Sequence, residues 1–183
     1  MRGRIAIPAF PMKTFNTCAA AATVCCVVLA SCGAPEVVSI PVRSSGSLSN
    51  QILQEVNRYR MSKGAAPLAR NPGLDRLAQE HCEYLRGRRR GSSLSRANIN
   101  HQGFKSRASY ARIYYHMSRL SENVAGVHGG TTVAPGRMVK LWSESPSHDH
   151  AMKGDWNATG IGAVVYSDGT VIATQLFGFS GTQ

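Results

Sequence analysis

The sequence predicts an α/β protein built as a three-layer α-β-α sandwich. Apolar residues recur at helical spacing over residues 49–64 and 72–85, and again in the stretch that ends at Trp142. Two β-rich runs, 159–166 and 170–179, close the chain. Helices early and late, with strands between and after them, favour one sheet that is covered by helices on both faces.

The first two predicted helices are bounded by capping residues. Ser49 is a favourable N-cap for the first helix. The helical recurrence of apolar residues stops at Gly64, which is expected to end this helix. Asn71 followed by Pro72 opens the second helix in the usual order of a cap and a first helical residue. His81 lies on the apolar face of this second helix, so we expect a buried imidazole that bonds to a backbone carbonyl.

The middle and the end of the chain supply the remaining elements. Residues 121–127 have the length and the β-branching of a short strand. Tyr110, Tyr114 and Met117 keep helical spacing, which predicts a packed stripe. Pro135 suits the first turn of the next helix. The Asp-Gly pair at 168–169 predicts a hairpin between the last two strands.

The N-terminal residues are typical of an export signal. A basic start precedes an apolar run over residues 18–30, about 13 residues, which is shorter than the roughly 20 that span a bilayer as a helix. The sequence Leu-Ala-Ser-Cys at 29–32 is similar to a bacterial lipobox, so Cys32 would be lipidated after cleavage, and Gly33 behind it would direct the protein to the outer membrane of a Gram-negative cell. The alternative is a plain secretory signal in which Cys32 is coincidental.

These features divide the chain into three parts. We assign residues 1–32 to a lipoprotein signal peptide, 33–48 to a flexible tether rich in proline, serine and glycine, and 49–183 to one folded domain. Met1 and Met12 both fit as the start of translation. The prediction is therefore an exported lipoprotein of the cell envelope, held to the membrane by its lipid anchor.

Cysteine use excludes a disulfide framework in the folded domain. Of the five cysteines, four lie at or before Cys32, and Cys82 remains in the domain. Because Cys82 lies within a helical pattern, we expect a buried and unreactive thiol.

The chain is strongly basic. Its formal net charge is +11, and removal of Arg2, Arg4 and Lys13 with the signal lowers this to +8. Such a charge favours anionic envelope surfaces such as phospholipid head groups. Nucleic acid is not an expected partner, because no nucleic-acid-binding motif accompanies the charge. The densest basic tract, 86–90, is interpreted either as a solvated helix end or as a dedicated anion site.

A candidate site is predicted where polar stretches could converge. His148 directly follows an apolar helical stretch that breaks at Pro146, and His101 and Glu122 supply a second imidazole and a carboxylate upstream. Two imidazoles with one or two carboxylates suit zinc with a water at the open position. The alternative is a hydrogen-bonded polar cleft in which Glu122 orients both histidines without a metal.

Several short motifs in a fixed order carry a family resemblance over residues 49–183. They are Asn57-Arg58-Tyr59-Arg60, Pro67-Leu68, the stretch from Leu74 to His81, the stretch from His101 to Phe104, Glu122-Asn123-Val124-Ala125, Trp142, Ser145-Pro146-Ser147-His148, Gly160-Ile161-Gly162 and Thr174-Gln175-Leu176-Phe177. In this order they resemble the CAP superfamily of cysteine-rich secretory proteins, antigen 5 and plant pathogenesis-related proteins, in its short bacterial form. The resemblance implies a three-layer α-β-α sandwich of the CAP type.

The resemblance also implies a central cleft in which two histidines and two acidic residues can hold a divalent metal such as zinc. His101, Glu122 and His148 match three of these positions. The fourth position departs from the pattern, because plant and animal members place a glutamate where this chain has Ser145, and Glu144 stands one residue earlier. We therefore include Glu144 in the candidate set as the least well matched member.

The function predicted from these observations is binding rather than catalysis. Members of the family are linked to sterol or lipid binding, and some to proteolysis, so we expect a membrane-anchored extracytoplasmic domain that binds a lipid or an anionic envelope ligand in the cleft. One alternative is a metal-dependent hydrolase in which zinc activates water and Glu144 acts as base. Another alternative is a structural tether to the cell wall.

Overall fold

The structure, a computed structural model, describes residues 45–181. The predicted signal peptide, Cys32 and the predicted tether up to residue 44 lie outside the described residues. The elements are α1 (Ser45–Ser62), β1 (Ala69–Arg70), α2 (Pro72–Arg88), α3 (Phe104–Tyr115), β2 (Arg119–Val127), α4 (Gly130–Ser143), α5 (Pro146–Lys153), β3 (Ala158–Val165) and β4 (Val171–Phe179). None of the helices within this range is long and apolar enough to cross a membrane.

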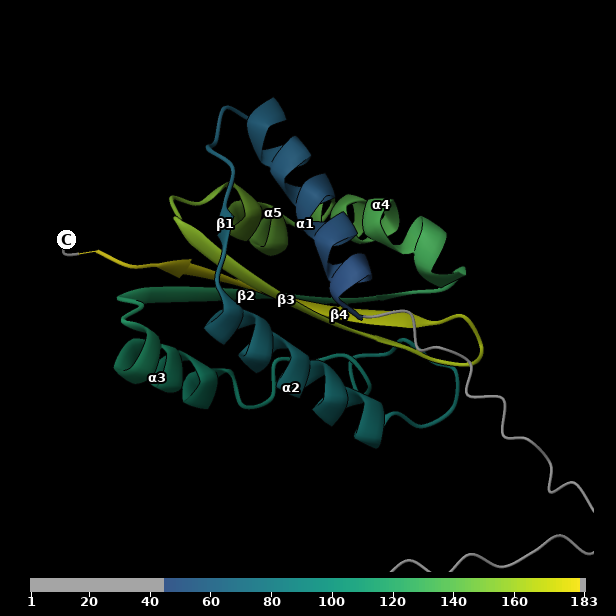
Figure 1. Cartoon of the computed structure of the whole chain (residues 1–183). Coiled ribbons are helices and arrows are strands. Elements are labelled where there is room, and N and C mark those ends of the chain that lie inside the picture. The colour runs from purple at the N-terminus through teal and green to yellow at the C-terminus, as the bar shows by residue number, and fades with distance from the viewer. Residues whose placement is uncertain (1–44, 182–183) are drawn as a thin grey trace, which may run out of the picture. The chain divides into compact units, whose positions relative to one another are not determined.

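A four-stranded sheet in the order β1-β3-β4-β2 forms the middle layer. The short strand β1 runs parallel to β3, and the other neighbours are antiparallel. Helices α1, α4 and α5 cover one face of the sheet, and α2 and α3 cover the other (Figure 1). This arrangement confirms the predicted three-layer α-β-α sandwich. Strand β2 is an edge strand of the sheet. Side chains from the two faces of the sheet can therefore approach each other past its free edge.

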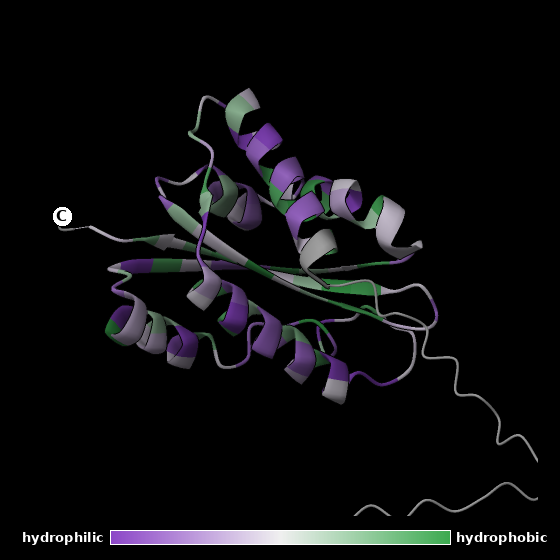
Figure 2. Cartoon of the chain, viewed as in Figure 1, coloured by the Kyte–Doolittle hydropathy of each residue, from purple (hydrophilic) through white to green (hydrophobic). Residues whose placement is uncertain are grey.

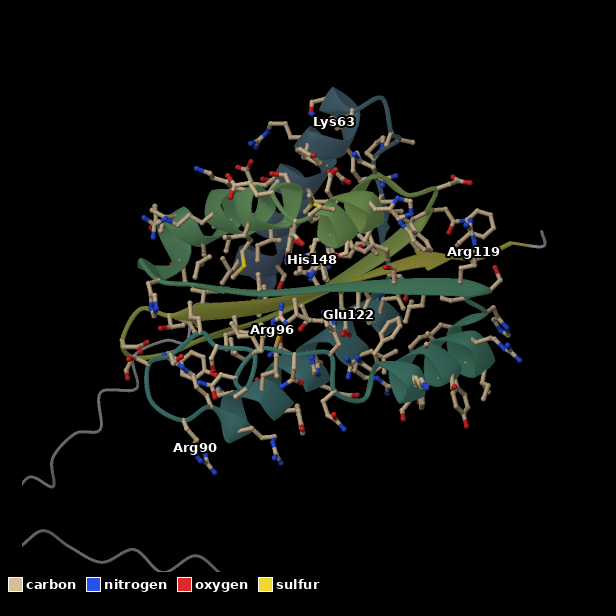
Figure 3. The ribbon with its side chains drawn as sticks, turned by 180° about the vertical axis from the view of Figure 1, so that it is seen from behind. Lys63, Arg90, Arg96, Arg119, Glu122 and His148 are labelled. Atoms are coloured by element: carbon tan, nitrogen blue, oxygen red, sulfur yellow. The ribbon has the colours of Figure 1, made fainter. Side chains whose placement is uncertain are left out.

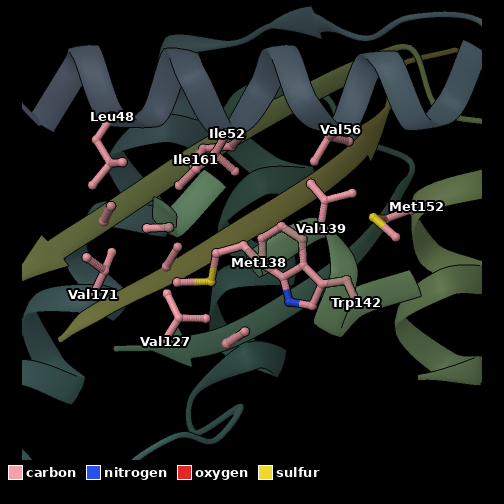
Figure 4. Packing of buried hydrophobic residues seen from close by; sticks show 14 of the residues in the cluster. Leu48, Ile52, Val56, Val127, Met138, Val139, Trp142, Met152, Ile161 and Val171 are labelled. Carbon is pink, nitrogen blue, oxygen red and sulfur yellow. The ribbon is translucent and has the colours of Figure 1, made fainter. Parts of the chain in front are cut away.

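The larger apolar core lies between the sheet and α1, α4 and α5. Leu48, Ile52 and Val56 project from one face of α1 toward Trp142 of α4 and Ile161 of β3 (Figure 4). Helix α1 begins at Ser45, earlier than the predicted cap at Ser49, because Leu48 joins this buried face at a spacing of one helical turn. The helix therefore includes the last residues of the predicted tether.

Apolar residues concentrate on the strands, whereas the outward faces of α1 and α2 are mainly hydrophilic (Figure 2). Helix α2 lies close to β3 at Gly160 and Gly162. A Cβ atom at Gly162 would lie 2.3 Å from the backbone nitrogen of Gln79, and one at Gly160 would lie 2.1 Å from the carbonyl carbon of Leu74. Only glycine permits this approach.

The helix break at Pro146 is confirmed, whereas the prediction for Pro135 is wrong. Ser145 is extended, with φ −106° and ψ 116°, and Pro146 is the first residue of α5. Pro135 does not lie in the first turn, because α4 already begins at Gly130. Gly129, at φ 108°, and Gly130, the first residue of α4, at φ 79°, make the turn that starts the helix earlier than predicted.

The predicted final hairpin is confirmed, with Gly169 at φ 76° in its turn. The predicted packed stripe is wrong for the two tyrosines of α3, because Tyr110 and Tyr114 are exposed and lie against each other with tilted rings, 4.3 Å between ring centroids. It is confirmed for Met117, which is buried just beyond the end of α3. Ala111 is instead the buried residue of α3. Aromatic spacing alone did not show which face of this short helix contacts the sheet.

Candidate functional site

Strand β2 positions Glu122 at the centre of the candidate site. The Glu122 side chain is 1% exposed and accepts a hydrogen bond from His101 Nδ1 at 2.9 Å. Because a carboxylate only accepts, this contact places the proton on Nδ1 of His101 and leaves Nε2 free to face a ligand. The His101 side chain is 50% exposed, so its imidazole lies between the buried Glu122 carboxylate and the solvent.

Arg107 of α3 holds the same carboxylate, and this contact was not predicted from the sequence. Its Nε donates to Glu122 Oε2 at 2.8 Å and its Nη2 to Oε1 at 2.9 Å, while Nη1 donates to the backbone oxygen of Gln102. This two-pronged geometry is the strong form of a charge-assisted pair. The signal available in the sequence was an arginine one turn into the helix that follows His101, and Gly103 at φ 79° makes the turn that brings it back.

His148 comes from α5 and lies on the opposite side of β2 from Glu122 (Figure 3). Asn123, the next residue of β2, points to that side and donates from Nδ2 to the backbone oxygen of His148 at 3.1 Å. The rings of His101 and His148 lie 6.1 Å apart between centroids. Successive residues of one edge strand thus hold the two imidazoles near each other. We call His101, Arg107, Glu122, Asn123 and His148 the β2-edge site.

The pKa of the His148 imidazole is lowered, first by burial and second by the nearby His101. An ordinary histidine titrates near pH 6.5, so His148 is mostly neutral at pH 7. A neutral imidazole can accept a hydrogen bond at one nitrogen and donate at the other.

Glu144, the fourth predicted residue, does not join the other three. It caps the C-terminus of α4, its side chain is 59% exposed, and its nearest charged partner is Lys140 at 3.7 Å. Among residues 45–181 it makes no hydrogen bond or ion pair with His101, Glu122 or His148. The predicted set therefore divides into three residues that converge and one that points elsewhere.

The predicted zinc ligands do not fit zinc in this arrangement. No group of three or more His, Cys, Asp or Glu side chains within the described residues is placed to hold a metal ion. Both oxygens of Glu122 are engaged by Arg107, whose positive charge would also repel a dication. In the metal-free alternative Glu122 would orient both histidines, but of the two it contacts only His101. Asn123 instead holds the backbone of His148, through its carbonyl oxygen.

Asp149 and His150, which stand where the resemblance implies arginine and alanine, have separate surroundings. Tyr59 of α1 donates to Asp149 at 2.5 Å, and this hydrogen bond is the main cause that raises the pKa of Tyr59 to about 12. Lys153 also pairs with Asp149. Asp149 therefore ties α5, which carries His148, to α1, whereas His150 is exposed.

Two predictions for residues of α2 are confirmed. His81 is 2% exposed, and its Nε2 lies 2.8 Å from the backbone oxygen of Asn100. Cys82 is fully buried beside Thr174, and burial raises the pKa of its thiol to about 12. The thiol is therefore protonated and unreactive at neutral pH.

Residues 53–177 match the family described as CAP, the cysteine-rich secretory protein family. The match covers most of the chain, so this protein belongs to the CAP family. No curated protein matches the chain closely enough to extend the comparison.

Solved structures share this fold. An outer surface protein from Borrelia burgdorferi is 19% identical with a TM-score of 0.59, and the alignment covers 75% of this chain and 96% of that one. A cysteine-rich secretory protein from Staphylococcus aureus is 16% identical with a TM-score of 0.52, over 75% of this chain and 40% of its own.

An extracellular protein with an SCP domain from Bacillus anthracis is 18% identical with a TM-score of 0.52, and the alignment covers 74% of this chain and 41% of that one. The chain thus spans about two fifths of the length of the Staphylococcus and Bacillus proteins. At these identities the likeness concerns the fold.

Proposed function

We propose that this chain is an exported, membrane-anchored CAP-domain protein that binds an anionic or lipid ligand of the cell envelope at the β2-edge site. The names of two relatives, an outer surface protein and an extracellular protein, support an extracytoplasmic location. The lipobox-like sequence that ends at Cys32 supports the anchor, although it lies outside the described residues.

The observation that carries the proposal is the charge state of the β2-edge site. Arg107 neutralises Glu122, so the site has no net negative charge that would attract a cation. The half-exposed imidazole of His101 and that of His148 then present hydrogen-bonding nitrogens to the surface, and each becomes a cation when it is protonated. An anionic or polar head group fits such a surface better than a metal ion does.

The hydrolytic alternative has less support. It requires a metal-bound water and a base in reach of it, and Glu144, the predicted base, is exposed beside Lys140. The proposed role is therefore binding without chemistry.

Binding to vesicles tests this function. We expect the mature chain, prepared without a lipid on Cys32, to bind vesicles that contain phosphatidylglycerol more tightly than neutral phosphatidylcholine vesicles, and to lose affinity as salt shortens the Debye length from about 10 Å at 0.1 M. The double variant His101→Ala/His148→Ala should bind more weakly, and co-sedimentation measures the loss.

His150→Ala is the matched control, because His150 is an exposed histidine of the same helix α5. It should bind as the wild type does. Equal binding by the double variant and by this control would contradict a role for the β2-edge site.

A further inference from the structure

The arginine tract at the end of α2 divides into two pairs with different surroundings. Arg86 forms an ion pair with Glu83 on the same helix. Arg89, whose side chain is 5% exposed, donates to Asp168 at 2.9 Å, and its guanidinium lies 4.2 Å from the ring centroid of Tyr166. Arg89 thus holds α2 against the hairpin, and the charge of Arg86 is compensated by Glu83 on its own helix.

Arg88 and Arg90 are different, because both line a surface pocket of about 510 Å³. Ser93, Ser95 and Asn98 contribute to the same wall. Both arginines are exposed, and neither pairs with a carboxylate in the part of the chain that the structure describes. The pocket therefore combines two uncompensated positive charges with serine hydroxyls.

Asn98 fixes the wall of this pocket. It is 6% exposed and donates from Nδ2 to the backbone oxygens of Arg90, at 3.1 Å, and Ser93, at 2.7 Å. Its Oδ1 accepts from the backbone nitrogen of Arg90, which closes the loop between them. The Ser93 hydroxyl accepts from the backbone nitrogen of Ser95, so its own proton remains free to donate to a ligand.

We propose that this pocket binds a phosphate group. Guanidinium groups donate in a planar fork that matches phosphate oxygens, and a tetrahedral phosphate can accept from two arginines and a hydroxyl at once. A pocket of this volume has room for a phosphate-bearing small molecule or head group. Arg90 lies at the end of α2, away from Glu122 and His148 (Figure 3), so the pocket is separate from the β2-edge site.

Titration with inorganic phosphate at constant ionic strength tests the proposal on the full mature chain in a nonionic detergent. We expect saturable shifts of the amide resonances of Ser93, Ser95 and Asn98. The double variant Arg88→Gln/Arg90→Gln should bind phosphate about tenfold more weakly or worse, because it removes charge-assisted hydrogen bonds.

The matched control is Lys105→Gln/Arg112→Gln, which removes the same charge from exposed positions of α3. Its phosphate affinity should stay within about twofold of the wild type, since only a diffuse charge effect remains. Equal losses in the two double variants, or shifts that do not saturate, would overturn the proposal.

A second measurement distinguishes the source of the phosphate. If the phosphate belongs to a lipid, Arg88→Gln/Arg90→Gln should bind phosphatidylglycerol vesicles more weakly than the control double variant does, when both chains are prepared without a lipid on Cys32. If the two bind vesicles equally while their affinities for inorganic phosphate still differ, the pocket serves a soluble phosphate-bearing ligand. Both results support the phosphate site, and the titration alone decides whether it exists.

Discussion

At Glu122, the guanidinium of Arg107 approaches the carboxylate to 2.6 Å, and both side chains are shielded from water. A buried carboxylate needs a partner, and either a metal ion or an arginine can supply the positive charge. Arg107 supplies it from within the chain and leaves His101 and His148 at the surface. Its replacement should therefore change which ions the site can hold.

We expect Arg107→Gln to destabilise the domain by about 3 kcal/mol, because it leaves the Glu122 carboxylate buried without its cation. We also expect zinc to stabilise this variant, since Glu122 then becomes available beside His101 and His148. Thermal unfolding with and without zinc measures both effects. The wild type should show no comparable zinc-dependent shift.

The triple change Arg107→Gln/His101→Ala/His148→Ala provides the control for that zinc effect. It should lose the stabilisation, because the imidazoles that would complete the ligand set are absent. If the wild type and Arg107→Gln respond to zinc equally, Arg107 is not what prevents metal binding.

A second prediction at the residue scale concerns pH. Burial is the largest cause that lowers the pKa of His81, followed by the charge of Arg107. As the pH falls below about 6.5, the unfolded chain takes up a proton at this position before the folded chain does. The contribution of His81 to stability is therefore present above that pH and is lost as the pH falls toward the lowered value.

Chemical unfolding at pH 7.5 and 5.5 measures this loss. The decrease in the free energy of unfolding should be smaller in His81→Gln than in the wild type. His150→Gln, a change at an exposed histidine, should keep the decrease of the wild type. An unchanged decrease in His81→Gln would assign the acid sensitivity to other groups.

Sequence reasoning at this scale succeeded where a residue type has one usual role. A histidine on an apolar helix face was expected to be buried, and His81 is. It failed where the partner depends on the direction of a side chain in three dimensions. The side chain of Arg107 points inward and that of Glu144 points outward. The positions of these residues in the sequence do not indicate either direction.

At the scale of elements, α2 and β3 depend on each other. Strand β1 covers only the start of β3, and beyond it Asp75 and Gln79 of α2 accept hydrogen bonds from the backbone nitrogens of Ile161 and Ala163. Side chains of α2 thus serve an otherwise unpaired strand edge. This is possible because the glycines of β3 let the helix approach closely.

We expect Gly162→Ala to destabilise the domain by about 2 kcal/mol or more, because the new Cβ would force α2 away from β3. Denaturant unfolding followed by circular dichroism measures the change. Gly136→Ala is the matched control, since a Cβ there meets no atom within 4 Å. That change in an exposed helical position should stabilise the domain by about 0.5–1 kcal/mol. A similar stability for both variants would contradict the proposed close approach.

The elements themselves were largely predictable, because caps and turns act locally. Asn71 accepts from the backbone nitrogen of Leu74 as an N-cap should, and Ser145 is extended before Pro146 as expected. The first residues of α1 and α4 were not predicted. The start of α1 depends on the tertiary burial of Leu48, and the start of α4 depends on the glycines at 129–130. Local signals set the type of each element, and packing sets its limits.

At the scale of the whole molecule, the proposed lipid anchor would hold a basic domain next to an anionic surface. The mature chain keeps a formal net charge of +8 once Arg2, Arg4 and Lys13 leave with the signal. Anchoring raises the local concentration of the domain at the membrane, so weak contacts from the β2-edge site and from the phosphate pocket would be sufficient to orient it. The anchor should therefore dominate membrane association.

We expect Cys32→Ala to release the protein from membranes or to stop its signal processing, because the thiol that would carry the lipid is absent. Cell fractionation measures the release, and mass spectrometry of the wild type should show an acylated N-terminus at Cys32. Cys82→Ala is the control, since this buried thiol of the folded domain should have no effect on anchoring. A mature wild-type chain that begins at another residue and carries no acyl mass would contradict the anchor, and charge alone would then have to account for any membrane binding.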